Sequence, residues 1–544
     1  MAKNPLLDFQ QELYNDAFNE AYFHLKHQPR ALQKYQQTFN ETLPKELIPK
    51  DFKDFLNQIK PGNTILIGDF HPSGASQKAA RNLIEMISKL RSDLHLQIGI
   101  EFFKAEHESF LDSYLNGQIT ELQLLKLTDY QVNWGFPWTS YGRLLMEIKN
   151  KKLNCFPFNY LRQKSRTMKS RDQKIAKKCW DSRQKIILET QKNPTQIILV
   201  GEHHLALDHL PKEMIKIGYT ATDLIRVFCN LDDFYFEIQK MGTNKPVEIA
   251  QLDSSSYCIF NSAPWIKWKS LTIWHDSQEK HFETLEYDDY YFDIDHLFLT
   301  LTEKLASLMN LSLSKNNIEN FNLMKTSSFD EHIKNQMIDR GISEEFIEEV
   351  QETIRVKGYA YIPQNRCLII DDDNPNHLIE LSGQHLFNCM RKSDKENIFL
   401  AKIIRFSFGF LARKIYDPNF SLHLMHQHKT FLQSNRSPTK SALVKRKRIS
   451  AKATLRFCEN LNSNHQLILK SFQRYDKATA GSVSRSIGKI IANSIFSKLT
   501  HQPIESRNIL INLVEKTQQK EIQSLDFLKE FILLDSIPSG RDAA

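Results

Sequence analysis

The apolar positions in the first half of the chain form short runs that end at polar residues. Residues 64–71 (TILIGDFH) and 196–204 (QIILVGEHH) are rich in β-branched residues, stop at a glycine, pass a carboxylate and reach a histidine. A third run, residues 94–100 (LHLQIGI), leads directly into Glu101. Uninterrupted apolar runs of this length are typical of strands buried on both faces of a parallel sheet. The pattern therefore predicts three such strands.

Between these runs the apolar residues recur at helical spacing. Residues 76–90 keep the i, i+3, i+4 rhythm through Leu83, Ile84 and Ile87. Further helices are expected at 105–127, 140–149 and 169–192, with strands at 153–157, 218–224 and 233–240. Strands that alternate with helices predict an α/β fold in which a mostly parallel sheet is flanked by helices.

The chain is too long for one hydrophobic core, because 544 residues exceed the usual size of a single domain. We expect a helical N-terminal extension (1–60), an α/β domain (61–245), a linker with a tryptophan-rich segment (246–290) and a mainly α-helical C-terminal domain (291–544). Residues 358–371 (GYAYIPQNRCLIID) interrupt the helical pattern of that last part. They predict a β-hairpin around Gln364 and Asn365.

Polar side chains follow all three of the first strands, which offer His71, Glu101 and His204. In open α/β sheets, ligands bind at the carboxyl ends of the strands. An ionised carboxylate at the end of a buried strand costs several kcal/mol unless it is paired or binds a cation. We therefore expect a shared polar site for a metal or a cofactor. Ordinary strand-to-loop exits give the same spacing, which by itself leaves both interpretations open.

Composition narrows the functional classes. Apolar residues make up 41% and charged residues 25% of the chain, which is typical of a soluble globular protein. No apolar run is long enough to predict a membrane span. The first residues, MAKNPLLDFQQELYNDAF, lack both the apolar core of a secretory signal and a lipobox cysteine, so a cytoplasmic location is expected.

Two other residue classes carry weaker signals. The 7 cysteines stand singly, with no Cys-x-x-Cys pair, which argues against a disulfide framework and a structural zinc ribbon. The net charge is +8, and the one dense basic run is KRKR at 445–448. Because no aromatic residue is interleaved there, the run favours a solvated face and gives no strong nucleic-acid signal.

Residues 63–235 resemble the ChaN-like domain of the haem-binding uptake and Tiki superfamily, whose relatives include TraB-like and erythromycin-esterase-like proteins. The resemblance rests on an ordered series of motifs: GDFH at 68–71, GIEFF at 99–103, FLDSYLNGQI at 110–119, the loop at 134–141, FPFN at 156–159, SRDQKIAK at 170–177 and VGEHH at 200–204. More than half of the chain lies outside it.

The resemblance implies that the shared polar positions of the superfamily fall on His71, Glu101, Arg171, Asp172 and His204. ChaN-like members are associated with haem binding and iron acquisition, and Tiki-like members with metal-dependent peptide cleavage. The first expectation is thus a haem- or iron-associated ligand-binding protein. The second is a metal-dependent hydrolase acting on peptides or esters. The third is an interaction protein that keeps the fold without the chemistry.

A hydrolase needs a divalent ion with an open coordination position. His71, Glu101 and His204 are the expected metal ligands. Glu101, Arg171 and Asp172 are the expected catalytic set, with Glu101 also suited to act as a general base and Arg171 to stabilise an oxyanion.

Haem binding needs an apolar cleft, an axial histidine or tyrosine, and basic groups near the propionates. Family members are thought to use a tyrosine on a dimer surface, which makes a homodimer an expectation here, but that tyrosine has no assignable counterpart in this chain. The nearby candidates are Tyr114, Tyr130, Tyr141, Tyr160, His203 and His209.

Three further features bear on the expected site. Asp69 stands where relatives often have glutamate, and Asp69 and Glu202 suit hydrogen bonds that orient the imidazoles. ChaN-like proteins are commonly lipoproteins, and this chain shows no anchor. The aromatic loop Trp134–Trp138 (WGFPW) is expected either to wall a pocket or to pack the domain edge.

Overall fold

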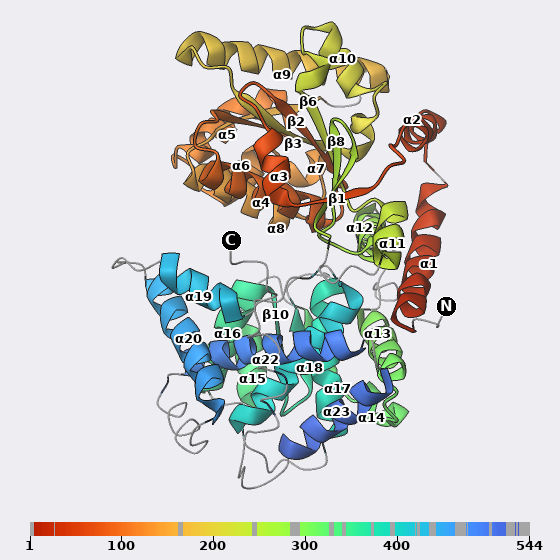
Figure 1. Cartoon of the computed structure of the whole chain (residues 1–544), viewed down its shortest axis with the longest axis vertical. Coiled ribbons are helices and arrows are strands. Elements are labelled where there is room, and N and C mark those ends of the chain that lie inside the picture. Colours follow the sequence, from red (N-terminus) through yellow and green to blue (C-terminus); the bar gives the residue numbers. More distant parts are fainter. Residues whose placement is uncertain are drawn as a thin grey trace. The chain divides into compact units, whose positions relative to one another are not determined.

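The computed structural model describes residues 5–26, 28–160, 167–241, 247–282, 294–325, 331–339, 344–370, 375–391, 398–418, 420, 425–434, 442–462, 475, 477–499, 503–517, 528 and 531. Contacts divide the chain into two compact units. Leu13–Leu285 is called the α/β unit, and Met1–Glu12 with Glu286–Ala544 is called the helical unit. Their elements are labelled in Figure 1.

The α/β unit is built on one sheet of 8 strands in the order β1-β7-β8-β6-β2-β5-β3-β4. The strands from β8 to β4 in this order run parallel, whereas β7 is antiparallel to both of its neighbours. The strands are β1 (Ile48–Lys50), β2 (Thr64–Asp69), β3 (Leu96–Lys104), β4 (Asn154–Asn159), β5 (Thr195–Gly201), β6 (Leu224–Cys229), β7 (Ile249–Asp253) and β8 (Ser256–Ile259).

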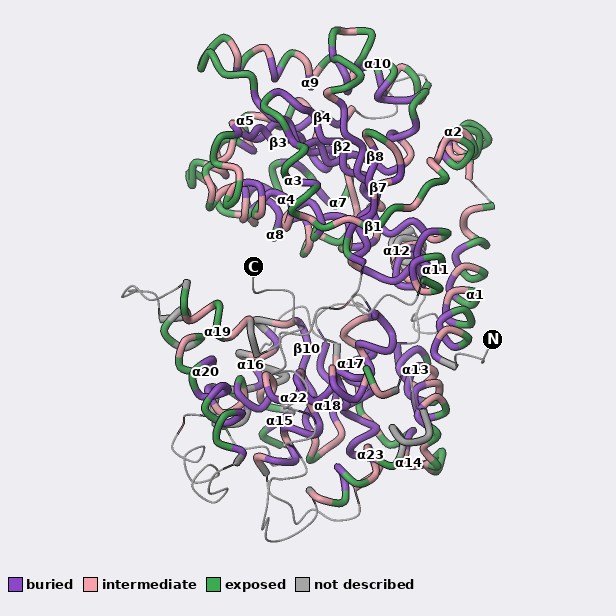
Figure 2. The backbone as a smooth tube through the Cα atoms, viewed as in Figure 1, coloured by how far each residue is buried: buried purple, intermediate pink, exposed green. Residues whose placement is uncertain are grey.

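Helices cover both faces of this sheet, because its central strands are apolar on both sides (Figure 1). Ile65 and Ile67 of β2 point to one core cluster, and Leu66 between them belongs to the other. Figure 2 shows the resulting band of buried backbone through the sheet. The helices are α1 (Pro5–Leu25), α2 (Arg30–Glu41), α3 (Phe52–Gln58), α4 (Gly74–Leu90), α5 (Glu108–Leu115), α6 (Glu121–Leu127), α7 (Tyr130–Asn133), α8 (Trp138–Asn150), α9 (Met168–Thr190), α10 (Leu210–Lys216), α11 (Asp232–Lys240) and α12 (Pro264–Phe282).

Two predicted strands of this unit are wrong. Residues 233–240 form the helix α11, which has Asp232 and Asp233 in its first turn and buries Phe234 and Ile238 at i, i+4 spacing. The strand expected at 218–224 lies later, as β6 (Leu224–Cys229). Its apolar run is interrupted by Arg226, which is buried and forms an ion pair with Asp253, with 2.9 Å between Nη2 and Oδ2.

Two other segments differ from the expected pattern. The helix expected at 105–127 is a 3-10 turn followed by α5 and α6, which are separated at Gly117, where φ is +76°. Residues 249–259, placed in the linker by the sequence pattern, form β7 and β8 of the sheet. The tryptophan-rich stretch begins α12, with Trp265 fully buried.

The helical unit contains a small sheet in the order β10-β11-β9 and a set of packed helices. The predicted hairpin is confirmed as β10 and β11, which are antiparallel. The elements are α13 (Ile294–Leu308), α14 (Lys315–Glu319), β9 (Asn322–Lys325), α15 (Glu331–Asp339), α16 (Glu344–Lys357), β10 (Tyr359–Ile362), β11 (Cys367–Ile370), α17 (Pro375–Met390), α18 (Ile398–Tyr416), α19 (Met425–Ser434), α20 (Ala442–Glu459), α22 (Lys477–Leu499) and α23 (Pro503–Thr517).

The predicted fold class is therefore confirmed: a mostly parallel α/β layer followed by a mainly helical part. No described helix combines the length and apolar character needed to cross a bilayer.

The helices α17, α18 and α22 approach one another closely at glycines. A Cβ at Gly383 of α17 would lie 2.7 Å from the Cβ of Ala412 in α18 and would also meet the carbonyl oxygen of Phe408. A Cβ at Gly488 of α22 would lie 2.8 Å from the Cβ of Phe406. The absence of side chains at these positions permits the contact between the helices.

Gly383→Ala should lower the free energy of unfolding of the helical unit by about 1–3 kcal/mol, because the methyl group overpacks a backbone contact. All 6 tryptophans lie at or before Trp274, so thermal unfolding followed by circular dichroism and by tryptophan fluorescence separates the two units. Ser382→Ala, at the neighbouring buried position, is the control and should cost less. Equal costs would contradict the packing argument.

Candidate functional site

The two Gly-x-x-His elements lie side by side because β2 and β5 are neighbours in the sheet. Their register pairs Asp69 with Gly201, so the two strands end at the same level. His71 follows β2 by two residues, and His204 lies in the 3-10 turn Glu202–Leu205 directly after β5. The sequence similarity of the two runs thus becomes spatial proximity.

Glu101 lies within β3, which continues to Lys104 instead of ending at Ile100 as the pattern indicated. The pairing of β3 with β5 stops at Ile100, and the register with β4 shifts between Ile100 and Lys104. Glu101 is therefore placed where β3 separates from β5. Its Oε2 accepts a hydrogen bond of 2.6 Å from the backbone N–H of Gly201.

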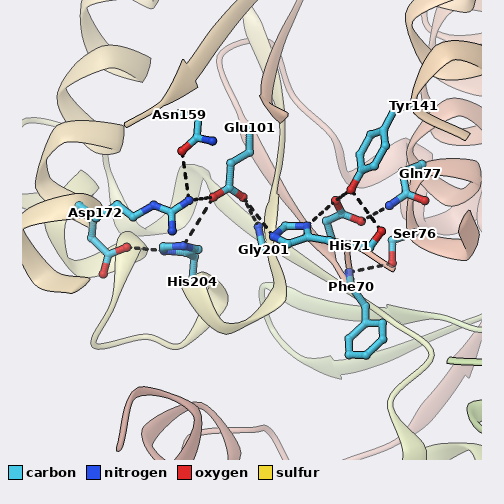
Figure 3. Close-up of polar contacts among 12 residues, drawn as sticks. Phe70, His71, Ser76, Gln77, Glu101, Tyr141, Asn159, Asp172, Gly201 and His204 are labelled. Atoms are coloured by element: carbon cyan, nitrogen blue, oxygen red, sulfur yellow. Dashed lines mark hydrogen bonds and ion pairs between the residues drawn. The ribbon is translucent and has the colours of Figure 1, made fainter. Parts of the chain in front are cut away.

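Glu101 forms the centre of the polar cluster drawn in Figure 3. It is 2% exposed, and its Oε1 accepts from Nη2 of Arg171 in the first turn of α9. The same Nη2 also donates to Oδ1 of Asn159 at 3.2 Å. Burial opposes the ionisation of Glu101, but the charge of Arg171, the two imidazoles and the Gly201 N–H hold its pKa below the usual range.

Each histidine is held by an aspartate on its Nδ1 side. The Nδ1 atom of His71 lies 2.9 Å from Oδ2 of Asp69, and that of His204 lies 2.5 Å from Oδ1 of Asp172. An ionised carboxylate only accepts hydrogen bonds, so Nδ1 carries the proton in both rings. The Nε2 atoms then face Glu101, at 4.0 Å from His71 to Oε2 and 3.9 Å from His204 to Oε1.

The structure therefore brings together all five predicted residues, with Glu101 between the two histidines (Figure 3).

Burial disfavours the charged imidazole of His71, but the hydrogen bond to Asp69 and the charges of Asp69 and Glu101 outweigh it and raise the pKa of His71.

Three further residues complete the cluster: Tyr35 and Gln77, which the sequence pattern did not single out, and Tyr141, which was expected only as a haem-ligand candidate. The hydroxyl of Tyr35 in α2 donates to Oδ2 of Asp172 at 2.9 Å and lies 2.9 Å from Nδ1 of His204. Asp69 accepts from the hydroxyl of Tyr141 at 2.7 Å and from the amide of Gln77 at 2.5 Å. Tyr35 and Tyr141 occupy buried positions of amphipathic helices, so the sequence pattern does not distinguish them from core residues.

The backbone of Gly201 packs closely against both imidazoles, and aromatic rings lie next to that of His71. A Cβ at Gly201 would lie 3.2 Å from Nε2 of His71 and 3.4 Å from Cδ2 of His204, so glycine leaves room for both rings. The rings of Trp134 and Phe136 lie 4.5 and 5.0 Å from that of His71. The WGFPW loop therefore borders the polar cluster, and its aromatic side chains also pack against the core of the unit.

The charges of this cluster bear on the expected metal ligands. Three carboxylates, Asp69, Glu101 and Asp172, surround the one guanidinium of Arg171, and Asp69 and Glu101 favour a positive charge on His71. Ligands 2.0–2.2 Å from one ion lie only about 3.4 Å apart in a tetrahedral site. The separations of 3.9 and 4.0 Å are longer, and Arg171 already engages Glu101. Within the described part of the chain, no three histidine, cysteine, aspartate or glutamate side chains form a group that could hold a metal ion.

A groove of about 960 Å³ lies next to this cluster, within the α/β unit. Helices α1 and α2 form one side, and the turn after β5, α11 and α12 form the other. The tryptophan ring of Trp268 meets Phe18 edge-on at 5.2 Å, and both line the groove. This volume falls in the upper part of the range of about 300–1,000 Å³ found for small-molecule and cofactor sites.

His203 faces this groove, whereas the adjacent His204 faces the polar cluster. The ring of His203 lies 5.2 Å from that of Phe39. Burial lowers the pKa of His203 to about 4, so its imidazole is neutral at pH 7. The buried Lys267 also lines the groove and pairs with Glu202 at 3.1 Å, whereas the lining residues Lys26 and Lys45 are exposed.

The other predicted haem-ligand candidates do not line the groove. His209 stacks on Tyr35 with ring centroids 3.6 Å apart and contacts the carbonyl of His203 through Nδ1. Tyr141 donates to Asp69, and Tyr130 donates to the carbonyl of Phe136. These side chains are engaged in the packing of the unit.

Comparison with protein families matches residues 55–197 to the family described as haem-binding uptake, Tiki superfamily, ChaN. The resemblance is thus confirmed for this segment, which contains His71, Glu101, Arg171 and Asp172. No curated protein and no solved structure matches the chain.

Arg171→Met should lower the free energy of unfolding of the α/β unit by about 3–5 kcal/mol, because it leaves the buried charge of Glu101 without its main partner. Urea unfolding followed by tryptophan fluorescence reports this unit alone. In a Glu101→Gln background the same change should cost much less, since no buried charge remains. An equal cost in both backgrounds would show that the ion pair does not determine the stability of the site.

Proposed function

We propose that the α/β unit, whose residues 55–197 match the haem-binding uptake family, binds haem in the groove between α1, α2 and the strand-end turn. The observation that carries this proposal is the orientation of His203, a neutral histidine on the wall of an aromatic-lined groove of about 960 Å³. An imidazole with a free nitrogen is a common axial ligand of haem iron.

The remaining groove residues suit the other parts of haem. Phe18, Phe39 and Trp268 offer apolar and aromatic surface to a flat ring system. The ammonium groups of the exposed Lys26 and Lys45 provide positive charge for the propionates. The haem iron would supply the ligand-binding or electron-transfer chemistry, while the protein holds the ring and sets its axial ligand.

Titration of the full chain with haemin should give a saturable Soret band at one haem per chain. His203→Ala should weaken binding at least tenfold and shift the Soret maximum, because it removes the axial nitrogen. The measurement is absorbance together with the electron paramagnetic resonance spectrum of the bound iron.

His95→Ala is the matched control, because His95 lies just before β3 and does not line the groove. It should leave affinity and spectrum unchanged. A Soret band that is identical in His203→Ala would refute the proposed axial ligand, and the absence of saturable binding at micromolar haemin would refute the proposed function.

A second candidate function is metal-dependent hydrolysis of a peptide or ester at the strand-end cluster. The observation that favours it is the excess of negative charge around two Nε2 atoms that both face Glu101. Asp69 and Asp172 hold the imidazoles in the tautomer that metal ligation needs. A divalent ion would supply Lewis-acid chemistry. His71, Glu101 and His204 are the residues that would hold it, although their separations of 4.0 and 3.9 Å in this structure do not form a ready metal-holding group.

The protein's own groups have clear roles in such a reaction. The hydroxyl of Tyr35 and the carboxylate of Asp172 fix the ring of His204. Arg171 neutralises Glu101, and its guanidinium is the group at this site that would stabilise an oxyanion. Trp134 and Phe136 limit the access of water to His71.

Dialysis against zinc or manganese, followed by elemental analysis, should leave about one ion per chain if this candidate is right. His71→Ala and His204→Ala should each reduce metal content and ester hydrolysis at least a hundredfold, and His95→Ala should reduce neither. Metal content that persists in both variants would reject the assigned ligands. If haemin binding and metal retention both fail in the wild type, the interaction-protein function remains.

A further inference from the structure

The helical unit holds a second buried cluster of charges, which plays no part in the α/β unit. Its centre is Glu380 of α17, which is fully buried. Nη2 of Arg485 in α22 lies 2.7 Å from Oε1 of Glu380, and Nη1 of Arg413 in α18 lies 3.4 Å from Oε2. Nη2 of Arg485 also donates to the hydroxyl of Tyr359 at 2.8 Å.

Two lysines extend the positive charge of this cluster. Lys489 lies one helical turn after Arg485, and its Nζ lies 5.2 Å from the centre of the Phe410 ring, which Arg485 also covers at 4.5 Å. Lys357 ends α16 just before Tyr359. The charges of Arg485 and Glu380 act on both ammonium groups.

The charges of these described residues do not balance. Four basic side chains, Lys357, Arg413, Arg485 and Lys489, stand against the one carboxylate of Glu380. Burial opposes the ionisation of Glu380, but the two arginines outweigh it and lower the pKa of Glu380 to about 2. Burial and the charge of Arg485 lower the pKa of Lys489 to about 8 and that of Lys357 well below its usual range.

An excess of buried positive charge is costly unless an anion compensates it. Arginine forks and lysine ammonium groups together match the oxygens of phosphate. The Arg485 and Arg413 side chains are 14% and 19% exposed, so the cluster reaches solvent but is too enclosed for a flat surface such as a membrane. A small soluble anion fits these conditions.

We propose that Lys357, Arg413, Arg485 and Lys489 form a binding site for a soluble ligand that carries phosphate groups. Glu380 holds the two arginines in place, and the two lysines contribute the charge that the ligand neutralises. The site shares no residue with the groove or with the strand-end cluster, because all of its residues belong to the helical unit.

Inorganic pyrophosphate is the probe, added to the full chain at constant ionic strength, and calorimetric titration and thermal unfolding by circular dichroism are the measurements. Saturable binding and a rise in the melting temperature of the helical unit are expected. Lys357→Gln and Lys489→Gln should each weaken binding at least tenfold. Lys447→Gln, which removes the same charge at an exposed position of α20, should not. No saturable binding in the wild type, or equal binding in all variants, would overturn the proposal.

A second measurement does not depend on binding. Without added anion, Lys489→Gln should unfold at the same or a higher temperature than the wild type, because it removes uncompensated positive charge. A lower melting temperature would mean that a carboxylate of the chain itself already compensates the lysine, and this would also overturn the proposal.

Discussion

The polar site of this protein depends on a buried ion pair between Glu101 and Arg171. A carboxylate that is 2% exposed can be ionised only if its oxygens are fully engaged, and Arg171 and the backbone of Gly201 engage them. This requirement connects three segments of the fold: the β3 bulge, the first turn of α9 and the end of β5. The two histidines take their positions around the pair that results.

The 3-10 turn Glu202–Leu205 contributes side chains to both the groove and the polar cluster. His203 and His204 are neighbours in sequence, yet one faces the groove and the other faces Glu101, since the 3-10 turn after β5 directs successive side chains apart. The groove is closed by α1 and α2, and α2 also supplies Tyr35 to the polar cluster. Both helices lie outside the segment that matches the family.

The helical unit also contains a buried ion-pair cluster, but there the basic side chains outnumber the carboxylates. There a single buried carboxylate, Glu380, organises two arginines, whereas in the α/β unit carboxylates outnumber the cation at the site. Close helix contacts at Gly383 and Gly488 bring the charged faces of α17, α18 and α22 together. The two units therefore present polar clusters of different chemistry, one rich in carboxylates and one rich in basic side chains.

The sequence by itself determined the parallel α/β layer, the hairpin at 358–371 and the placement of His71, Glu101 and His204 after three strands, because buried strands and their polar ends leave a local pattern. Arg171 and Asp172 were expected only from the resemblance to a family, since they lie on helix α9. The sequence pattern placed a strand at 218–224, whereas the strand is β6 at Leu224–Cys229, whose apolar run is interrupted by Arg226. It also placed a strand at 233–240, where the aromatic residues of helix α11 resemble those of a strand. Only the tertiary structure decided that Arg171 pairs with Glu101, that the hydroxyl of Tyr35 contacts His204, and that His203 lines a groove. These contacts join residues far apart in the chain, and the physical forces behind them, burial and charge compensation, depend on spatial neighbours that no local pattern specifies.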